Sequence, residues 1–127
     1  MLTSSRITAI VPVSDLEAAI RFYEGTLGLK LTERHDFEGF PEARFEAGDG
    51  HLNTYQSGYA GQAGHTLAGF RVDNLDAVMA DLRSRGVEFQ DYDFPGLKTE
   101  NGVATLAGIR AAWFKDPDGN ILAIDES

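Results

Sequence analysis

A repeated pattern of expected elements constrains the fold of this 127-residue chain more than any other feature. Residues 6–13 (RITAIVPV) are β-branched and apolar, which predicts a strand, and residues 14–29 place apolar side chains along one helical face. The same pair follows in the second half, as a strand over 65–72 (HTLAGFRV) and a helix over 73–87. The chain therefore repeats one strand–helix unit.

Short motifs align the two halves. VSDL begins at Val13 and VDNL begins at Val72, an offset of 59 residues. Ser14 or Asp15 in the first copy, and Asn74 in the second, are suited to cap a helix because their side chains accept a free backbone N–H. The helices are therefore expected to begin at matching places in the two copies.

Each helical pattern is followed by strand-like runs, ARFEAG and HLNTYQS in the first half and AAWFK and NILAI in the second. The turns also match, with GDGHL starting at residue 48 and PDGNI at residue 117, an offset of 69. The sequence thus predicts an α+β fold of two βαβββ modules, 1–57 and 65–127, joined by a Gly-rich connector at 58–64 within a single domain, 1–127. A helix on one face of each sheet leaves the other face free, and two such sheets that curl toward each other enclose a cleft.

Composition excludes several classes of function. The chain has no cysteine, which rules out disulfides and thiolate metal sites, and no apolar run approaches the roughly 20 residues that cross a bilayer. The N-terminal residues lack the basic region of a secretory signal, so a cytoplasmic protein without membrane association is expected. A formal charge of −9 disfavours binding to nucleic acid.

Two stretches carry a resemblance to a known family. VSDLEAAIRFYEGTLGLKL and FKDPDGNILAI resemble the signature stretches of the vicinal oxygen chelate superfamily, which includes glyoxalases, extradiol dioxygenases, fosfomycin-resistance enzymes, bleomycin-resistance proteins and methylmalonyl-CoA epimerase. The resemblance implies a cupped mixed sheet, the glyoxalase/bleomycin resistance/dihydroxybiphenyl dioxygenase-like fold. It also implies a homodimer with its pocket between modules or subunits.

The resemblance further implies where a divalent metal would be held. Family enzymes usually place one ligand on the first strand, seven residues before the Asp of the helix-opening motif, and Thr8 occupies that position. The symmetric position is Leu67, the carboxylate of the last strand falls on Ala123, and a fourth position lies within residues 52–54 (Leu-Asn-Thr). None of these is a histidine or a carboxylate, so we expect no metal and no other cofactor.

The alternative to the absence of a metal is a metal site built from ligands at other positions than the standard ones. His51 and His65, with Glu46 or Asp49 nearby, form a weak fallback metal site. The simpler interpretation makes His51 a turn residue and His65 a rim residue of the connector. His35 is expected to be plain surface.

Without a metal, the resemblance leaves a concave and partly apolar cup, with Ala111 and Trp113 facing it. A tryptophan there would stack on a planar or glycosylated ligand, worth roughly 0.5–1.5 kcal/mol beyond the buried area. Packing in the core is the alternative for Trp113, and equally for Phe45 and Tyr55. The expected pocket comprises Thr8, Phe45, Thr54, Tyr55, His65, Leu67, Ala111, Trp113 and Ala123.

Residues 92–108 are rich in turn-forming residues and contain Phe94, Pro95 and Leu97. Connections longer than about 12–15 residues in a compact domain tend to be functional or disordered. The segment is therefore interpreted as a flap over the cup, with Arg110 at its base, or as a poorly ordered surface loop.

The leading hypothesis is metal-independent binding of a small organic molecule, of the drug-sequestering or carrier type. The net negative charge of the chain would favour a cationic ligand. A lyase, isomerase or dioxygenase with displaced ligands or no metal is the alternative, which leaves open whether the protein is an enzyme. A purely structural module, whose cup is filled by its own side chains, is the third interpretation.

Overall fold

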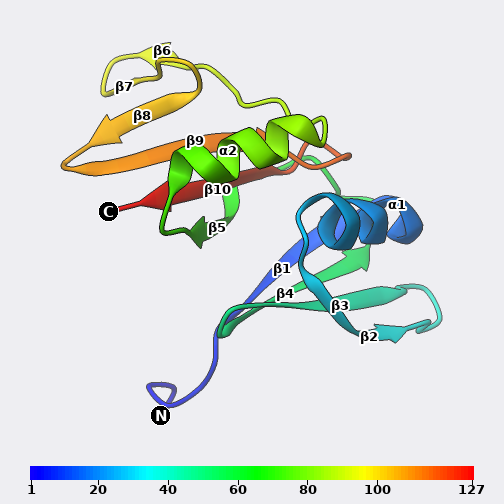
Figure 1. The fold of residues 1–127 in the computed structure, drawn as a ribbon. Helices are drawn as coiled ribbons and strands as arrows, with labels where there is room; N and C mark the ends of the chain where they lie inside the picture. The colour runs from blue at the N-terminus through cyan, green and yellow to red at the C-terminus, as the bar shows by residue number, and fades with distance from the viewer. The chain divides into compact units, whose positions relative to one another are not determined.

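The computed structural model describes residues 1–127, and the chain divides into two compact units, 1–62 and 63–127 (Figure 1). Both units contain a four-stranded mixed sheet with a helix packed on one face. The α+β class and the repeated βαβββ plan predicted from the sequence are therefore confirmed. None of the helices combines the length and the apolar character that a membrane span requires.

The first unit has strand order β1-β4-β3-β2, with β1 parallel to β4 and the other neighbours antiparallel. Its helical segment begins as an α-helix and continues directly as a π-helix. The elements are β1 (Thr8–Val13), α1 (Leu16–Ile20), η1 (Arg21–Thr26), β2 (Lys30–His35), β3 (Glu42–Ala47) and β4 (Gly50–Gln56).

Side-chain capping and apolar packing hold this helix on the sheet. The Asp15 carboxylate accepts hydrogen bonds from the backbone N–H groups of Glu17 (3.0 Å) and Ala18 (3.3 Å). The fully buried Tyr23 ring packs on the Phe45 ring, with 5.8 Å between centroids. The helix therefore covers one face of the sheet and leaves the other uncovered.

The second unit has strand order β5-β10-β9-β8, with β5 parallel to β10. The Asn74 side chain caps α2 by accepting from the backbone N–H of Ala77 (3.0 Å), and Figure 1 shows α2 lying over β9 and β10. The elements are β5 (Thr66–Arg71), α2 (Leu75–Ser84), β6 (Asp93–Phe94), β7 (Leu97–Lys98), β8 (Val103–Leu106), β9 (Ile109–Lys115) and β10 (Ile121–Glu126).

The segment 92–108 is not one continuous loop. Its first part is the small hairpin of β6 and β7, and its later part supplies β8, the edge strand of the main sheet. A hydrogen-bond network closes the hairpin: Thr99 Oγ1 donates to Asp91 Oδ1 (2.8 Å) and accepts from the backbone N–H of Tyr92 (2.8 Å). The residues that connect β7 to β8 are held at Asp91, which also accepts from the Gly102 N–H (2.9 Å).

The two matching hairpin turns differ in length. In the first unit Ala47 pairs with Gly50, so two residues separate the strands. In the second unit Lys115 pairs with Ile121, so the residues from Asp116 to Asn120 form the turn. The second turn is therefore longer, and this changes how the two sequences align beyond it.

Candidate functional site

The uncovered face of the first sheet is polar and hollowed. Thr8, His51 and Glu46 lie side by side on β1, β4 and β3 and belong to this face because their neighbours along each strand are turned to the helix. The hollow has a volume of about 350 Å³. Its lining residues are Arg6, Thr8, Thr32, Glu33, Arg44, Glu46, His51 and Asn53.

Most polar groups in the hollow have partners on the protein. The Arg6 guanidinium lies 2.6 Å from His51 Nε2, and Arg44 forms ion pairs with Glu42 (2.9 Å) and Glu33 (3.4 Å). A guanidinium can only donate, so His51 Nε2 accepts and its ring carries its hydrogen on Nδ1. The hollow thus presents an ordered set of donors and acceptors.

Two expected pocket residues of this unit lie in the core instead. Phe45 and Thr54 are fully buried on the helix side, and Thr54 Oγ1 donates to the Ala43 carbonyl (3.4 Å). Thr8 and Tyr55 lie on the uncovered face. Asn53, between Leu52 and Thr54, lines the hollow, and the strict alternation of β4 is the signal that identifies it.

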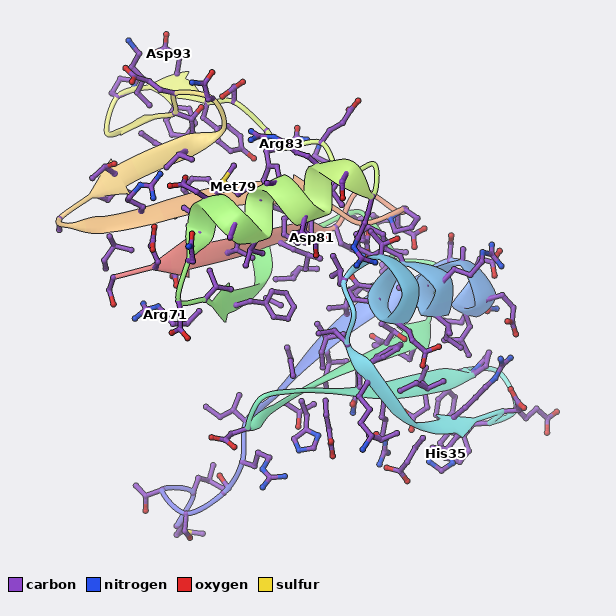
Figure 2. The ribbon with its side chains drawn as sticks, viewed as in Figure 1. His35, Arg71, Met79, Asp81, Arg83 and Asp93 are labelled. Carbon is purple, nitrogen blue, oxygen red and sulfur yellow. The ribbon has the colours of Figure 1, made fainter.

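An aromatic cluster also belongs to the first unit. The His35 and Phe37 rings are stacked, with 5.0 Å between centroids and 8° between planes, and Phe40 lies 5.3 Å from Phe37. Figure 2 shows His35 extending from β2 on the side of the sheet opposite the helix. His35 is therefore part of a ring stack, which its position in the sequence did not indicate.

The uncovered face of the second sheet contains Trp113, the only tryptophan of the chain. Trp113 is paired with Ala123, which in turn is paired with Gly69, so one large ring has two small neighbours in the same row. Ala111 lies two residues before Trp113 on β9 and therefore on the same face, while Leu67 falls at a register shift of β5 between Thr66 and Ala68. Trp113 and Ala123 are therefore neighbours on this face, whereas Ala111 lies in the row of Asp125 and Leu67 lies near Ile121, on opposite sides of Ala123.

The β6–β7 hairpin contacts this face through Tyr92. The Tyr92 ring meets the Trp113 ring edge-on, at 5.7 Å and 83°, and lies 6.0 Å from the Phe94 ring. Phe94 is 53% exposed, Pro95 is exposed and Leu97 is half-buried. The anchor of the expected flap is therefore Tyr92, a residue that the sequence did not single out.

Arg110, expected at the base of the flap, is directed to the helix side. Its guanidinium forms ion pairs with Asp76 of α2 (2.8 Å) and Glu126 of β10 (2.6 Å). The hydrogen bond from Arg110 lowers the pKa of the Asp76 carboxyl, and bonds to both carboxylates raise the pKa of Arg110. Arg110 thus ties α2 to the sheet and does not reach the uncovered face.

The residues present do not fit the metal that the family resemblance implies. No three histidine, aspartate, glutamate or cysteine side chains come together as a metal-binding group. Thr8, Leu67 and Ala123 occupy the standard ligand positions. The fallback site lacks support because His51 Nε2 is taken by Arg6, while His65 is exposed and its Nδ1 lies 3.1 Å from the Thr66 carbonyl.

Comparisons with known proteins agree with this architecture. The sequence model of the Glyoxalase/Bleomycin resistance protein/Dioxygenase superfamily matches residues 6–124. A search of the curated proteins finds no match. The chain is similar in structure to TnmS3, an antibiotic binding protein from Streptomyces sp. CB03234, with 24% identity, a TM-score of 0.70, and coverage of 99% of this chain and 98% of that one.

Two further solved structures show the same fold. A glyoxalase/bleomycin resistance protein from Catenulispora acidiphila is 29% identical, with a TM-score of 0.69 and coverage of 98% of this chain and 99% of that one. A glyoxalase family protein from Enterococcus faecalis is 20% identical, with a TM-score of 0.72 and coverage of 99% and 100%. The likeness extends over essentially the whole chain in both cases.

Proposed function

Because the chain belongs to the Glyoxalase/Bleomycin resistance protein/Dioxygenase superfamily, we propose that it binds a small organic molecule without a metal, as a drug-sequestering or carrier protein. The observation that carries the proposal is the row of Gly69, Ala123 and Trp113 on the uncovered face of the second sheet. Small side chains beside a large ring leave room for a planar group to lie against the indole. Stacking there would contribute about 0.5–1.5 kcal/mol beyond the buried area.

Two further observations support binding over metal-dependent chemistry. The side chains at the family's ligand positions offer no histidine or carboxylate, and a sequestering protein needs no group that reacts. TnmS3, which has the same fold, is an antibiotic binding protein. For a lyase, isomerase or dioxygenase with displaced ligands, no group of three metal-ligating side chains is present.

The fluorescence of Trp113 gives a direct test. We propose to titrate the protein with bleomycin and with planar polycyclic antibiotics, and we expect saturable quenching by at least one compound. Ala123→Leu would fill the space beside the indole while keeping the fluorophore, so the same compound should bind at least about fivefold more weakly, in line with the volume cost of an overfilled contact. Tyr59→Ala, which removes an exposed aromatic ring of the first unit, is the matched control and should bind normally.

Equal binding by wild type and Ala123→Leu would argue against the position of the site. Trp113→Ala, measured by calorimetry, gives a second variant, and Trp113→Phe should retain part of the affinity. Elemental analysis of protein purified without chelators tests metal independence, since stoichiometric zinc, nickel, manganese or iron would contradict it.

We further propose a cytoplasmic homodimer that does not engage nucleic acid. The formal charge of −9 supports the last point, since such a chain is repelled by phosphate backbones. Light scattering after size exclusion tests the dimer, with a mass of one chain, 13.8 kDa, as the contrary result.

A further inference from the structure

The hollow on the first sheet contains two charges that no protein group neutralises. Arg44 is already balanced by Glu42 at 2.9 Å and Glu33 at 3.4 Å. The remaining charged residues of the lining are Arg6 and Glu46, and neither forms an ion pair with an oppositely charged side chain. Arg6 and Glu46 are therefore the charged residues of the lining that have no ion-pair partner on the protein.

Arg6 is held in place by a neutral partner. Its guanidinium donates to His51 Nε2 at 2.6 Å, and an imidazole that accepts in this way carries no positive charge of its own and supplies no negative charge. One guanidinium offers five N–H donors in a planar fork, which suits a carboxylate. The contact with His51 thus orients Arg6 and leaves most of its donors for a ligand.

Glu46 is directly beside His51 on the neighbouring strand. Lys30 lies next to Glu46 on the other side, in register on β2, but no ion pair joins them. Glu46 is half-buried, and its carboxylate has no cationic partner on the protein. A protonated amine of a ligand would supply that partner.

We infer that the hollow binds a small zwitterion, with the carboxylate of the ligand on Arg6 and its protonated amine on Glu46. The inference rests on the proposed function, since it names the chemistry of a bound molecule. His51 stands between the two charged groups, which keeps them from neutralising each other and separates the two ends of the ligand. The hydroxyl of Thr8 and the amide of Asn53 line the same space and complete the polar contacts. A volume of about 350 Å³ is at the small end of ligand pockets, which run from about 300 to 1,000 Å³.

Three compounds that each carry a phenyl group distinguish the contributions of the two charges of the ligand. L-phenylalanine carries both, phenethylamine carries only the cation and 3-phenylpropionate only the anion. Binding is measured as chemical-shift changes of the backbone and side-chain amides of Asn53 in ¹⁵N-labelled full-length protein. L-phenylalanine should bind about two- to fivefold more tightly than either analogue, the effect of one exposed ion pair.

Two variants test which residue binds the carboxylate of the ligand and which binds its amine. Arg6→Gln should reduce the affinity for L-phenylalanine to that of phenethylamine, and Glu46→Gln should reduce it to that of 3-phenylpropionate. Glu38→Gln removes an equal charge from the exposed loop before β3 and is the control, with unchanged binding. Equal affinities for the three probes, or equal losses in Glu38→Gln and Glu46→Gln, would overturn the inference.

The outcome separates this inference from the proposed function. Antibiotic binding that depends on Ala123, together with no preference for L-phenylalanine, would overturn the zwitterion site and leave the proposed function in place. A preference for L-phenylalanine that Arg6→Gln abolishes, without binding of any antibiotic, would support the hollow and refute the site at Trp113.

Discussion

The turn from Asp116 to Asn120 should be a main contributor to the stability of the second unit. Asp116 Oδ1 accepts from the backbone N–H groups of Asp118 and Asn120, both at 2.9 Å, and Oδ2 accepts from Asn120 Nδ2 at 2.8 Å. Asp116 is 5% exposed and Asn120 is fully buried. The carboxylate therefore holds three donors, two of them on a buried residue.

The magnitude follows from what Asp116→Ala leaves unpaired. A buried donor that loses its partner costs about 1–3 kcal/mol, so the two donors of Asn120 predict a loss of about 3–4 kcal/mol in the free energy of unfolding. With a urea m-value of about 2 kcal/mol/M, the midpoint should fall by about 1.5–2 M. Asp116→Asn keeps an oxygen for the two backbone N–H groups but opposes one amide NH₂ to another, so we expect about half that loss.

Urea unfolding followed by Trp113 fluorescence is the assay, because Trp113 lies on β9, the strand that leads into the turn. Far-UV circular dichroism of the same samples checks that both probes report one transition. Asp49→Ala in the shorter turn of the first unit is the matched control, since Asp49 is exposed and makes no side-chain hydrogen bond. A loss for Asp116→Ala within about 1 kcal/mol of that for Asp49→Ala would refute the reasoning, because unpaired buried donors should cost more than that.

Three further predictions concern single contacts. Arg110 lowers the pKa of Asp76 from its ordinary value of 3.8, so this pair adds stability above pH 3.8 that is lost as the pH falls through the lower folded pKa. In Asp76→Asn, the midpoint temperature of thermal unfolding should therefore fall less steeply below pH 4 than in the wild type. Gly102→Ala should lower the urea midpoint by the equivalent of about 1–3 kcal/mol, because φ is +82° and the added Cβ would lie 2.9 Å from Phe89 Cβ; a neutral effect would contradict the close approach of Gly102 to Phe89. Asp15→Ala should cost about 1 kcal/mol by removing the helix cap, with Asp15→Asn close to wild type in the same melts.

Most of what can be predicted about the fold from the sequence follows from its internal repeat. The first strands and the helices align at one offset of 59 residues, which places Thr8 and Leu67 at corresponding positions, and Asp15 and Asn74 cap their helices as expected. The contact of Tyr92 with Trp113 could not be predicted in the same way. It depends on where a short hairpin folds back, which is set by the Asp91–Thr99 network and not by any periodic pattern.

The misplacement of Thr54 has a specific cause in the second turn. The similarity between GDGHL and PDGNI gives an alignment offset of 69 residues, which pairs Thr54 with Ala123. Six residues separate Phe45 from its partner Leu52, and seven separate Phe114 from its partner Leu122, so the strands after the turns align at 70. Leu52 then corresponds to Leu122, both buried, and Asn53 corresponds to Ala123, both on the uncovered face. A shift of one residue moves every side chain of a strand to the opposite face. The network around Asp116 that stabilises the longer turn is thus also what places Ala123 beside Trp113, and the position equivalent to Ala123 in the first unit is an amide that lines the polar hollow.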